Sequence, residues 1–219
     1  SGALVYHRQA LYGDAMTGNR RLCEETKAHA DRLFPCWIIG PHLPCDFPPE
    51  SEVFAEMQAR GVRAVRIEPD LMGYHPDPAM WRAWTDRLRA SQTLCVFSRL
   101  STANPEDWCA LFEGIPLLMV DHTWGEWRRV VRLMQRFPNL HIDFSAFQAH
   151  YALETIATEF GIDRCLFGTG LPERAPGTAR GFADFAFLPE SDVAAFSHGN
   201  LLRLLGNPVL AGPVGEGPF

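Results

Sequence analysis

The sequence predicts an α/β protein in which a parallel sheet is covered by helices. Short apolar runs alternate with helical stretches along almost the whole chain, which is the pattern of repeated strand–helix units. The stretches between these units are short, so we expect one domain without a linker. Hydrophobic residues make up 47% of the 219 residues, which is enough to build a single core of this size.

The first half of the chain contains four of these units. Asn104 precedes Pro105 and is a typical helix N-cap followed by proline in the first turn. Pro78 opens another helix in the same way, and Ser51 is expected to cap a third. We expect strands at 3–7, 33–39, 63–68 and 93–98, and helices at 18–30, 51–60, 78–91 and 104–113.

The second half continues the alternation. Trp127, Val130 and Met134 share one face of a predicted helix, as expected for a helix packed on a sheet. The Gly- and Pro-rich tail at 207–219 lies outside the predicted domain, which covers 1–206. We expect strands at 116–122, 139–145 and 165–167, and helices at 124–136, 150–160, 177–187 and 191–205.

Two architectures fit about seven such units. An open doubly wound sheet is one, although no GxGxxG motif follows an early strand and 168–170 lacks the third glycine. A (β/α)8 barrel is the other. Such a barrel has eight strands and typically about 250 residues, so this chain looks one strand short.

The composition excludes several classes of function. The formal charge is −6 and no basic stripe is present, which argues against nucleic acid as a partner. No apolar run reaches the length of about 18 residues that a membrane-spanning helix needs. The six cysteines form no CxxC pair, so we expect reduced thiols and a cytoplasmic protein.

Polar side chains gather at the predicted strand ends. In a barrel these ends meet at one rim, where catalytic groups collect. This clustering is the main argument from the residues for a functional site. The polar positions are His7, His42, Glu68, Ser98–Arg99, Asp121–His122, Asp143–Ser145 and Thr169–Gly170.

Five of these residues are catalytic candidates. His122, next to Asp121, is the best acid–base group because imidazole titrates near neutral pH. Arg99 could hold a carboxylate through its planar guanidinium. Glu68 or Asp143 could orient the imidazole. Each also has a structural interpretation, such as a helix cap or an ion pair.

Three further residues are candidates for substrate binding. His42 lies in a loop and could equally be a solvated imidazole. Trp124, beside His122, is as compatible with a core or lid position as with a substrate platform. Thr169 is small and could instead hydrogen-bond its own loop.

Two C-terminal motifs resemble a known family. Residues 164–172 read RCLFGTGLP, and 199–204 read GNLLRL. They are similar to the closing strand and helix of the amidohydrolase-2 family, in the amidohydrolase superfamily. The resemblance extends from about 3 to 206. It implies a (β/α)8 barrel that hydrolyses or decarboxylates a small molecule. The family usually uses a divalent metal, with zinc or manganese as the default.

The chain departs from the metal ligands that the resemblance implies. These are an HxH pair on strand 1, a histidine on strand 5 and an aspartate at the end of strand 8. The chain begins at the family's strand 2, which leaves out the HxH pair. Residues 97–99, at the end of strand 5, include no histidine, and Gly170 occupies the aspartate position. Only His122 matches a family histidine. We therefore assign no metal ligand and expect a barrel lacking or displacing strand 1.

Three interpretations stay open at this point. The chain could be a hydrolase that acts on a small molecule, including one bearing a carboxylate, after loss of the metal centre. It could be a non-catalytic binding or assembly subunit. Its first strand could also come from an upstream segment or another chain. Open strand edges promote association, so we expect a homo-oligomer or a complex with a related subunit.

Overall fold

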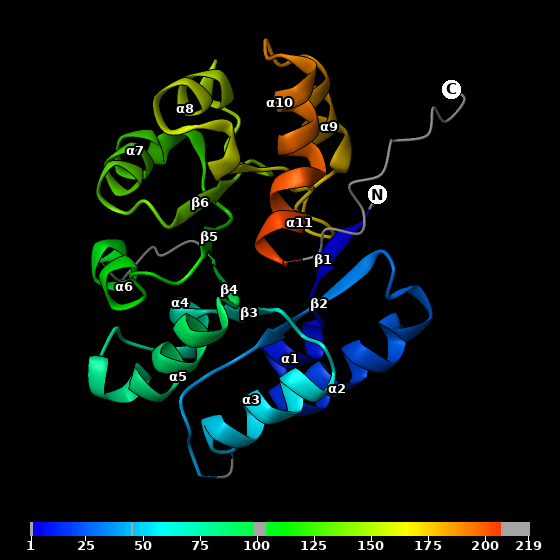
Figure 1. Cartoon of the computed structure of the whole chain (residues 1–219), viewed down its shortest axis with the longest axis vertical. Helices are drawn as coiled ribbons and strands as arrows, with labels where there is room; N and C mark the ends of the chain where they lie inside the picture. The colour runs from blue at the N-terminus through cyan, green and yellow to red at the C-terminus, as the bar shows by residue number, and fades with distance from the viewer. Residues whose placement is uncertain (1, 45, 99–103, 207–219) are drawn as a thin grey trace.

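Seven parallel strands form a single curved sheet (Figure 1). The computed structural model describes residues 2–44, 46–98 and 104–206. The strands follow one another in sequence order, and each pairs with the next, as in the register Ala64↔Leu94. Their bounds are β1 Ala3–Val5, β2 Leu33–Ile38, β3 Ala64–Ile67, β4 Leu94–Phe97, β5 Leu117–Met119, β6 Leu140–Asp143 and β7 Cys165–Leu166.

This strand order decides between the two predicted architectures. A doubly wound sheet reverses its strand order at a switch point, whereas these strands run from β1 to β7 without a reversal. The sheet curls into an incomplete TIM barrel, which confirms the prediction of a barrel one strand short. β1 and β7 are the outermost strands of the described sheet.

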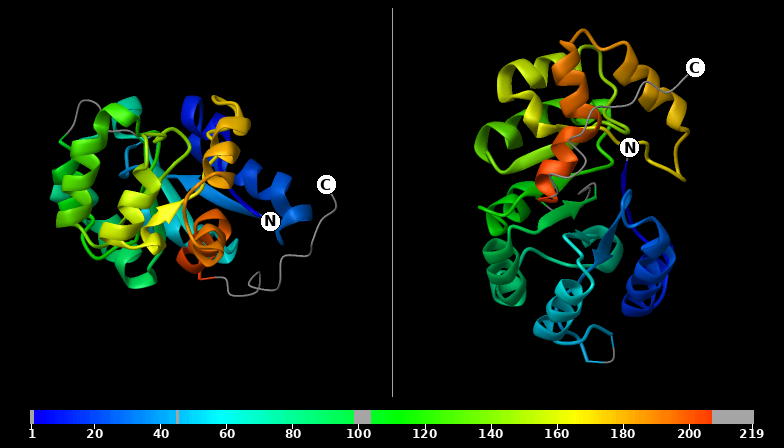
Figure 2. Two further views of the ribbon diagram at one scale, coloured as in Figure 1. Left: turned by 90° about the horizontal axis from the view of Figure 1, so that it is seen from above. Right: turned by 45° about the vertical axis from the view of Figure 1, so that its right-hand side comes forward.

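Helices cover the outer face of the sheet (Figures 1 and 2). The C-terminal helices lie beside the two outermost strands, β1 and β7. A backbone hydrogen bond of 3.1 Å from Phe167 N–H to the Phe196 carbonyl links them to the segment that follows β7. The α-helices are α1 Arg8–Tyr12, α2 Ala15–Thr26, α3 Glu50–Ala59, α4 Pro69–Met72, α5 Pro78–Ser91, α6 Pro105–Leu111, α7 Trp127–Arg136, α8 Ala152–Phe160, α9 Pro176–Asp184, α10 Glu190–Ala194 and α11 Asn200–Leu204. The short helices are η1 Lys27–His29, η2 Trp124–Glu126, η3 Ile162–Arg164 and the π-helix η4 Ala195–Gly199.

Most helix ends agree with the sequence-based expectations. The Asn104 side chain accepts a hydrogen bond from Glu106 N–H, so the predicted cap is confirmed. The Ser51 cap was wrong, because α3 begins at Glu50 after Pro49, one residue earlier. The short helices α1 and α4 were not predicted. Pro69, expected only to stop a strand, occupies the first turn of α4.

Strand alternation separates two groups of buried side chains. Trp37, Val65 and Phe97 belong to the larger core, between the sheet and its helices. Cys36 and Val96 belong to a second cluster inside the curve of the sheet. Successive side chains on a strand point to opposite faces. Residues at 66, 68 and 98 therefore share the inner face with Ala64, Leu94 and Val96.

Buried polar side chains join helices to strands. Asn19 on α2 donates to the Ile38 carbonyl at 2.8 Å and accepts from Ile38 N–H at 2.9 Å. Asn200 donates to the carbonyls of Ile162 and Cys165 at 2.7 and 2.8 Å. Buried backbone groups need such partners, so these amides hold the helices in register with β2 and β7.

Three other expectations concern the chain as a whole. Cys23, Cys36, Cys95, Cys109 and Cys165 are free thiols, as expected, and burial raises the pKa of Cys36 to about 12. In the part of the chain that the structure describes, every helix is too short or too polar to cross a bilayer. The domain bounds and the cytoplasmic location stay predictions, and the tail at 207–219 lies outside the described residues.

Candidate functional site

The inner face of the sheet opens into a cavity of about 1200 Å³. Apolar side chains such as Val96, Leu118 and Leu166 form one part of its wall. Polar side chains from the carboxyl ends of the strands form another part, as expected for the rim of a barrel. Residues of both outermost strands line it, as do residues from α10, η4 and α11. The cavity therefore brings strand ends and C-terminal helices to one site.

Arg66 organises one side of this cavity. Its Nε donates to Glu68 Oε1, and Ser98 Oγ donates to Glu68 Oε2. Its Nη2 lies 3.4 Å from Asp121 Oδ2. The guanidinium carbon lies 4.5 Å from the centre of the Tyr6 ring, a cation–π contact. Burial raises the pKa of Tyr6, so its hydroxyl stays protonated at neutral pH.

Asp143, at the end of β6, is a buried carboxylate of the cavity. The residue is only 7% exposed, as is Glu68. Oδ1 accepts hydrogen bonds from the backbone N–H of Ser145, at 3.0 Å, and from the Ser145 hydroxyl. Burial raises its pKa to about 6, although the Ser145 hydrogen bonds act in the opposite direction. This carboxyl group therefore changes charge close to neutral pH.

Gly168 leaves the space that the Asp143 carboxylate occupies. A Cβ atom on Gly168 would lie 1.8 Å from Asp143 Oδ2, closer than atoms can approach. Two residues later, Gly170 has a φ of +65°, which L-residues with side chains rarely adopt. The segment after β7 thus approaches Asp143 with backbone at Gly168, and Thr169 also lines the cavity there.

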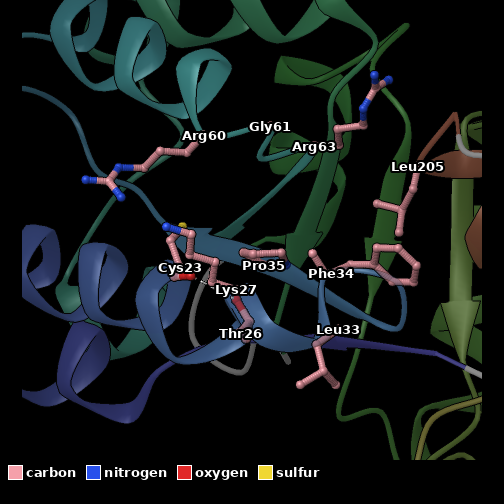
Figure 3. Close-up of a pocket in the computed structure, with 11 residues that line it drawn as sticks. Cys23, Thr26, Lys27, Leu33, Phe34, Pro35, Arg60, Gly61, Arg63 and Leu205 are labelled. Carbon is pink, nitrogen blue, oxygen red and sulfur yellow. Dashed lines mark hydrogen bonds between the residues drawn. The ribbon is translucent and has the colours of Figure 1, made fainter.

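A second, smaller hollow lies around the start of β2 (Figure 3). Its volume is about 260 Å³, and Phe34, Pro35 and Leu205 supply apolar contacts. Figure 3 shows the Arg60 and Arg63 side chains directed away from these apolar residues. No group of converging polar side chains marks this hollow among the described residues, so the larger cavity is the candidate site.

A family model shows where this chain belongs. The model described as amidohydrolase matches residues 3–206, nearly the whole described chain. The chain belongs to the amidohydrolase family. This confirms the resemblance found in the two C-terminal motifs. Among the curated proteins, none matches the chain in sequence.

Solved structures with the same fold include decarboxylases. An uncharacterized TIM-barrel protein, Bb4693 from Bordetella bronchiseptica, matches with a TM-score of 0.75 and 18% identity over 94% of this chain and 77% of that one. A 2,6-dihydroxybenzoate decarboxylase from Rhizobium matches with a TM-score of 0.64 and 16% identity over 91% and 78%. A 5-carboxyvanillate decarboxylase from Sphingomonas paucimobilis matches with a TM-score of 0.67 and 15% identity over 93% and 78%. At these identities the matches show the fold alone.

The described residues do not fit the zinc or manganese centre that the family implies. Throughout 2–44, 46–98 and 104–206, no three His, Cys, Asp or Glu side chains are placed to hold a metal ion. Gly170 offers no ligand side chain where the resemblance implies an aspartate. Ser98, whose hydroxyl donates to Glu68, follows β4 where the resemblance implies a histidine. We therefore derive the chemistry of this site from the side chains of the chain.

The structure brings together about half of the predicted site residues. Glu68, Asp121, Asp143 and Thr169 all line the cavity. Arg99 lies outside the described residues. The cavity lining does not include His122, His42 or Trp124.

The other three candidates lie in different surroundings. His122 is 1% exposed, and its Nδ1 is 3.9 Å from Glu126 Oε2. His42 is exposed, with Nδ1 2.6 Å from the Phe47 carbonyl oxygen. Trp124 is 73% exposed. Their functional roles stay predictions, and the cavity directs attention to Asp143.

Sequence reasoning missed Tyr6, Arg66 and Gly168. Arg66 had a usable signal, because it lies two residues before Glu68 on one strand and so shares its face. Gly168 directly follows the predicted strand at 165–167, where a missing side chain leaves room for a neighbour. The contact between Gly168 and Asp143 could not be recognised from the sequence, because it depends on the pairing of β6 with β7.

Proposed function

We propose that this protein is a hydrolase for a small molecule and that Asp143 carries the proton transfer. One observation supports this most directly. Asp143 is buried at a strand end, faces a cavity of about 1200 Å³, and has a pKa raised by burial to about 6. A general base is most effective when its pKa lies near the working pH. Membership of the amidohydrolase family supports hydrolysis as the reaction class.

The proposed reaction uses Asp143 as a general base. Its carboxylate removes a proton from a water molecule, and the water oxygen attacks the electrophilic carbon of the substrate. The proton then passes from Asp143 to the leaving group, which departs with the bonding electrons. The protonated Tyr6 hydroxyl, in the wall of the same cavity, is the candidate donor to the oxygen that gains negative charge.

The substrate need not carry a carboxylate. Two of the structural neighbours named above are decarboxylases of aromatic acids, by their names. In this chain, however, the described cation deepest in the cavity is Arg66, which already contacts Glu68 and Asp121. A substrate carboxylate would compete with both for this guanidinium. A substrate carboxylate would need another cation, for which Arg174 in the cavity lining and the sequence-predicted Arg99 are the candidates.

Hydrolysis can be tested with a panel of small amides, esters and lactones in ¹⁸O-labelled water. We expect one ¹⁸O atom in the product of each turnover. We also expect kcat/KM to fall about tenfold for each pH unit below about 6, because the base becomes protonated. Asp107→Asn, an exposed carboxylate on α6, is the matched control for charge removal. A pH profile that stays flat between 4 and 8 would contradict the role of Asp143.

We also propose that the chain associates through its outermost strands. β1 and β7 end the described sheet, and strand edges that lack a neighbour in their own sheet tend to pair with other polypeptides. Light scattering coupled to size exclusion at micromolar concentration should then give a mass above 24.6 kDa. A monomeric mass over the whole concentration range would remove this proposal without affecting the proposed chemistry.

A further inference from the structure

Negative charge exceeds positive charge in the cavity. The described residues that line it include the carboxylates of Glu68, Asp121, Asp143, Glu173 and Glu190, against the guanidiniums of Arg66 and Arg174. Among the described side chains, the Arg66 guanidinium forms ion pairs with both Glu68 and Asp121. Asp143 is a third carboxylate in the lining of the same cavity. Buried carboxylates without a balancing cation are costly, so an incoming positive charge would be stabilised.

Asp143 Oδ2 is an acceptor that the fold leaves available. Both Ser145 hydrogen bonds go to Oδ1. None of the described residues donates a hydrogen bond to Oδ2, although the side chain is only 7% exposed. Oδ2 packs over Gly168, and the residue lines the cavity. A carboxylate oxygen that lines a cavity and has no donor of its own among the described residues is a natural partner for an N–H group on a ligand.

Part of the mouth of the same cavity is apolar. Tyr12, Leu71 and Leu171 are 65%, 50% and 57% exposed, and all three belong to the cavity lining. Exposed apolar side chains around a concave site usually contact the apolar part of a ligand. The cavity therefore combines apolar side chains at its entrance with carboxylates inside.

We propose that this cavity binds an organic cation with an apolar body, such as an amine or amidine attached to an aromatic or aliphatic group. The cationic end lies near Asp121 and Asp143, and the apolar end contacts the rim at Leu71 and Leu171. This inference rests on the proposed function for its site and names the substrate class of that site. An organic cation has the opposite charge to the aromatic acids that appear in the names of two structural neighbours.

Three probes of similar size and different charge test this proposal by calorimetry: benzylamine, benzyl alcohol and benzoate at neutral pH. We expect benzylamine, as its ammonium ion, to bind about tenfold more tightly than benzoate, with benzyl alcohol between them. Added salt should weaken the binding of benzylamine. Asp121→Asn should lower its affinity about fivefold, and Asp107→Asn should leave it unchanged.

Two results would overturn the proposal. One is equal or tighter binding of benzoate; if Arg99→Gln then removed that preference, Arg99 would be the carboxylate-holding group. The other is the absence of binding by all three probes up to 10 mM. Neither readout involves turnover. Binding of benzylamine, together with no hydrolysis of any compound in the amide, ester and lactone panel, would therefore reject the proposed reaction and keep the ligand class. Hydrolysis limited to acidic substrates would reject the ligand class and keep the proposed reaction.

Discussion

Replacement of Asp143 by asparagine is expected to lower kcat/KM by at least about 100-fold, the usual contribution of a general base. Asparagine has nearly the same shape and can keep a carbonyl oxygen in the place of Oδ1, where Ser145 donates two hydrogen bonds. It cannot accept a proton from water at neutral pH. The loss of turnover should therefore come from the chemistry and leave the fold intact.

The same substitution is expected to stabilise the fold above pH 6. Burial raises the pKa of Asp143 from an ordinary value of 3.8 to about 6, so the folded protein holds this proton more tightly than the unfolded chain does. Below pH 3.8 the group is neutral in both states and its burial has no ionic cost. As the pH rises from 3.8 to about 6, the free energy of unfolding decreases, and above about 6 this loss is complete. The difference between the two pKa values corresponds to about 3 kcal/mol at most.

Urea unfolding at several pH values measures this effect. The gain in the free energy of unfolding of Asp143→Asn over the natural protein should grow from about zero near pH 4 to about 2–3 kcal/mol at pH 7.5. Asp107→Asn, on the exposed surface of α6, should change stability by less than about 0.5 kcal/mol at either pH. A variant destabilised equally at pH 4 and pH 7.5 would show that the raised pKa of Asp143 is not the cause.

Substitution of Gly168 by alanine is expected to displace the Asp143 carboxylate from its position. The added Cβ would lie 1.8 Å from Asp143 Oδ2 and 2.9 Å from its Cγ, so the carboxylate must move from its position. Overpacking of this kind costs about 1–3 kcal/mol. Because a general base acts only when correctly placed, kcat/KM should also fall about 100-fold.

A double-mutant cycle isolates this contact. In an Asp143→Ala background the carboxylate is absent, so Gly168→Ala should cost less than about 0.5 kcal/mol there. Gly177→Ala on α9 is the matched control, because its Cβ would meet nothing within 4 Å. That substitution should be neutral or slightly stabilising, since alanine favours helix. Equal costs of Gly168→Ala in both backgrounds would mean that the strain arises from the backbone and not from Asp143.

Local patterns predicted the secondary structure because their causes are local. The helix at 78–91 was predicted to the residue, since Pro78 opens it and the apolar period runs to its end. The strands were predicted to within three residues at each end. The cap at Ser51 failed by two positions because Pro49 already supplies a backbone conformation that can precede a helix.

The candidate site was predicted only in part. Glu68 and Asp143 were recognised because strand ends in a barrel meet at one rim, a rule that needs only the order of the elements. His122 also follows a strand, but its side chain is buried beside Glu126 and does not line the cavity. Asp121, directly before it, has a φ of +63°, so the chain departs from extended geometry at this point. The direction of a side chain past a strand end depends on such turns, which residue spacing does not reveal.

The sequence by itself determined the number and order of the seven described strands, the family, and the glycine at 170 shortly after β7. The tertiary structure alone decided which groups meet. Arg66 and Asp121 are 55 residues apart in the chain, and the carboxylate of Asp143 rests on Gly168 only because β6 pairs with β7. Periodicity and capping depend on neighbours within a few residues. The charge balance and the burial of a cavity depend on strand register and loop direction, which are set by packing across the whole sheet.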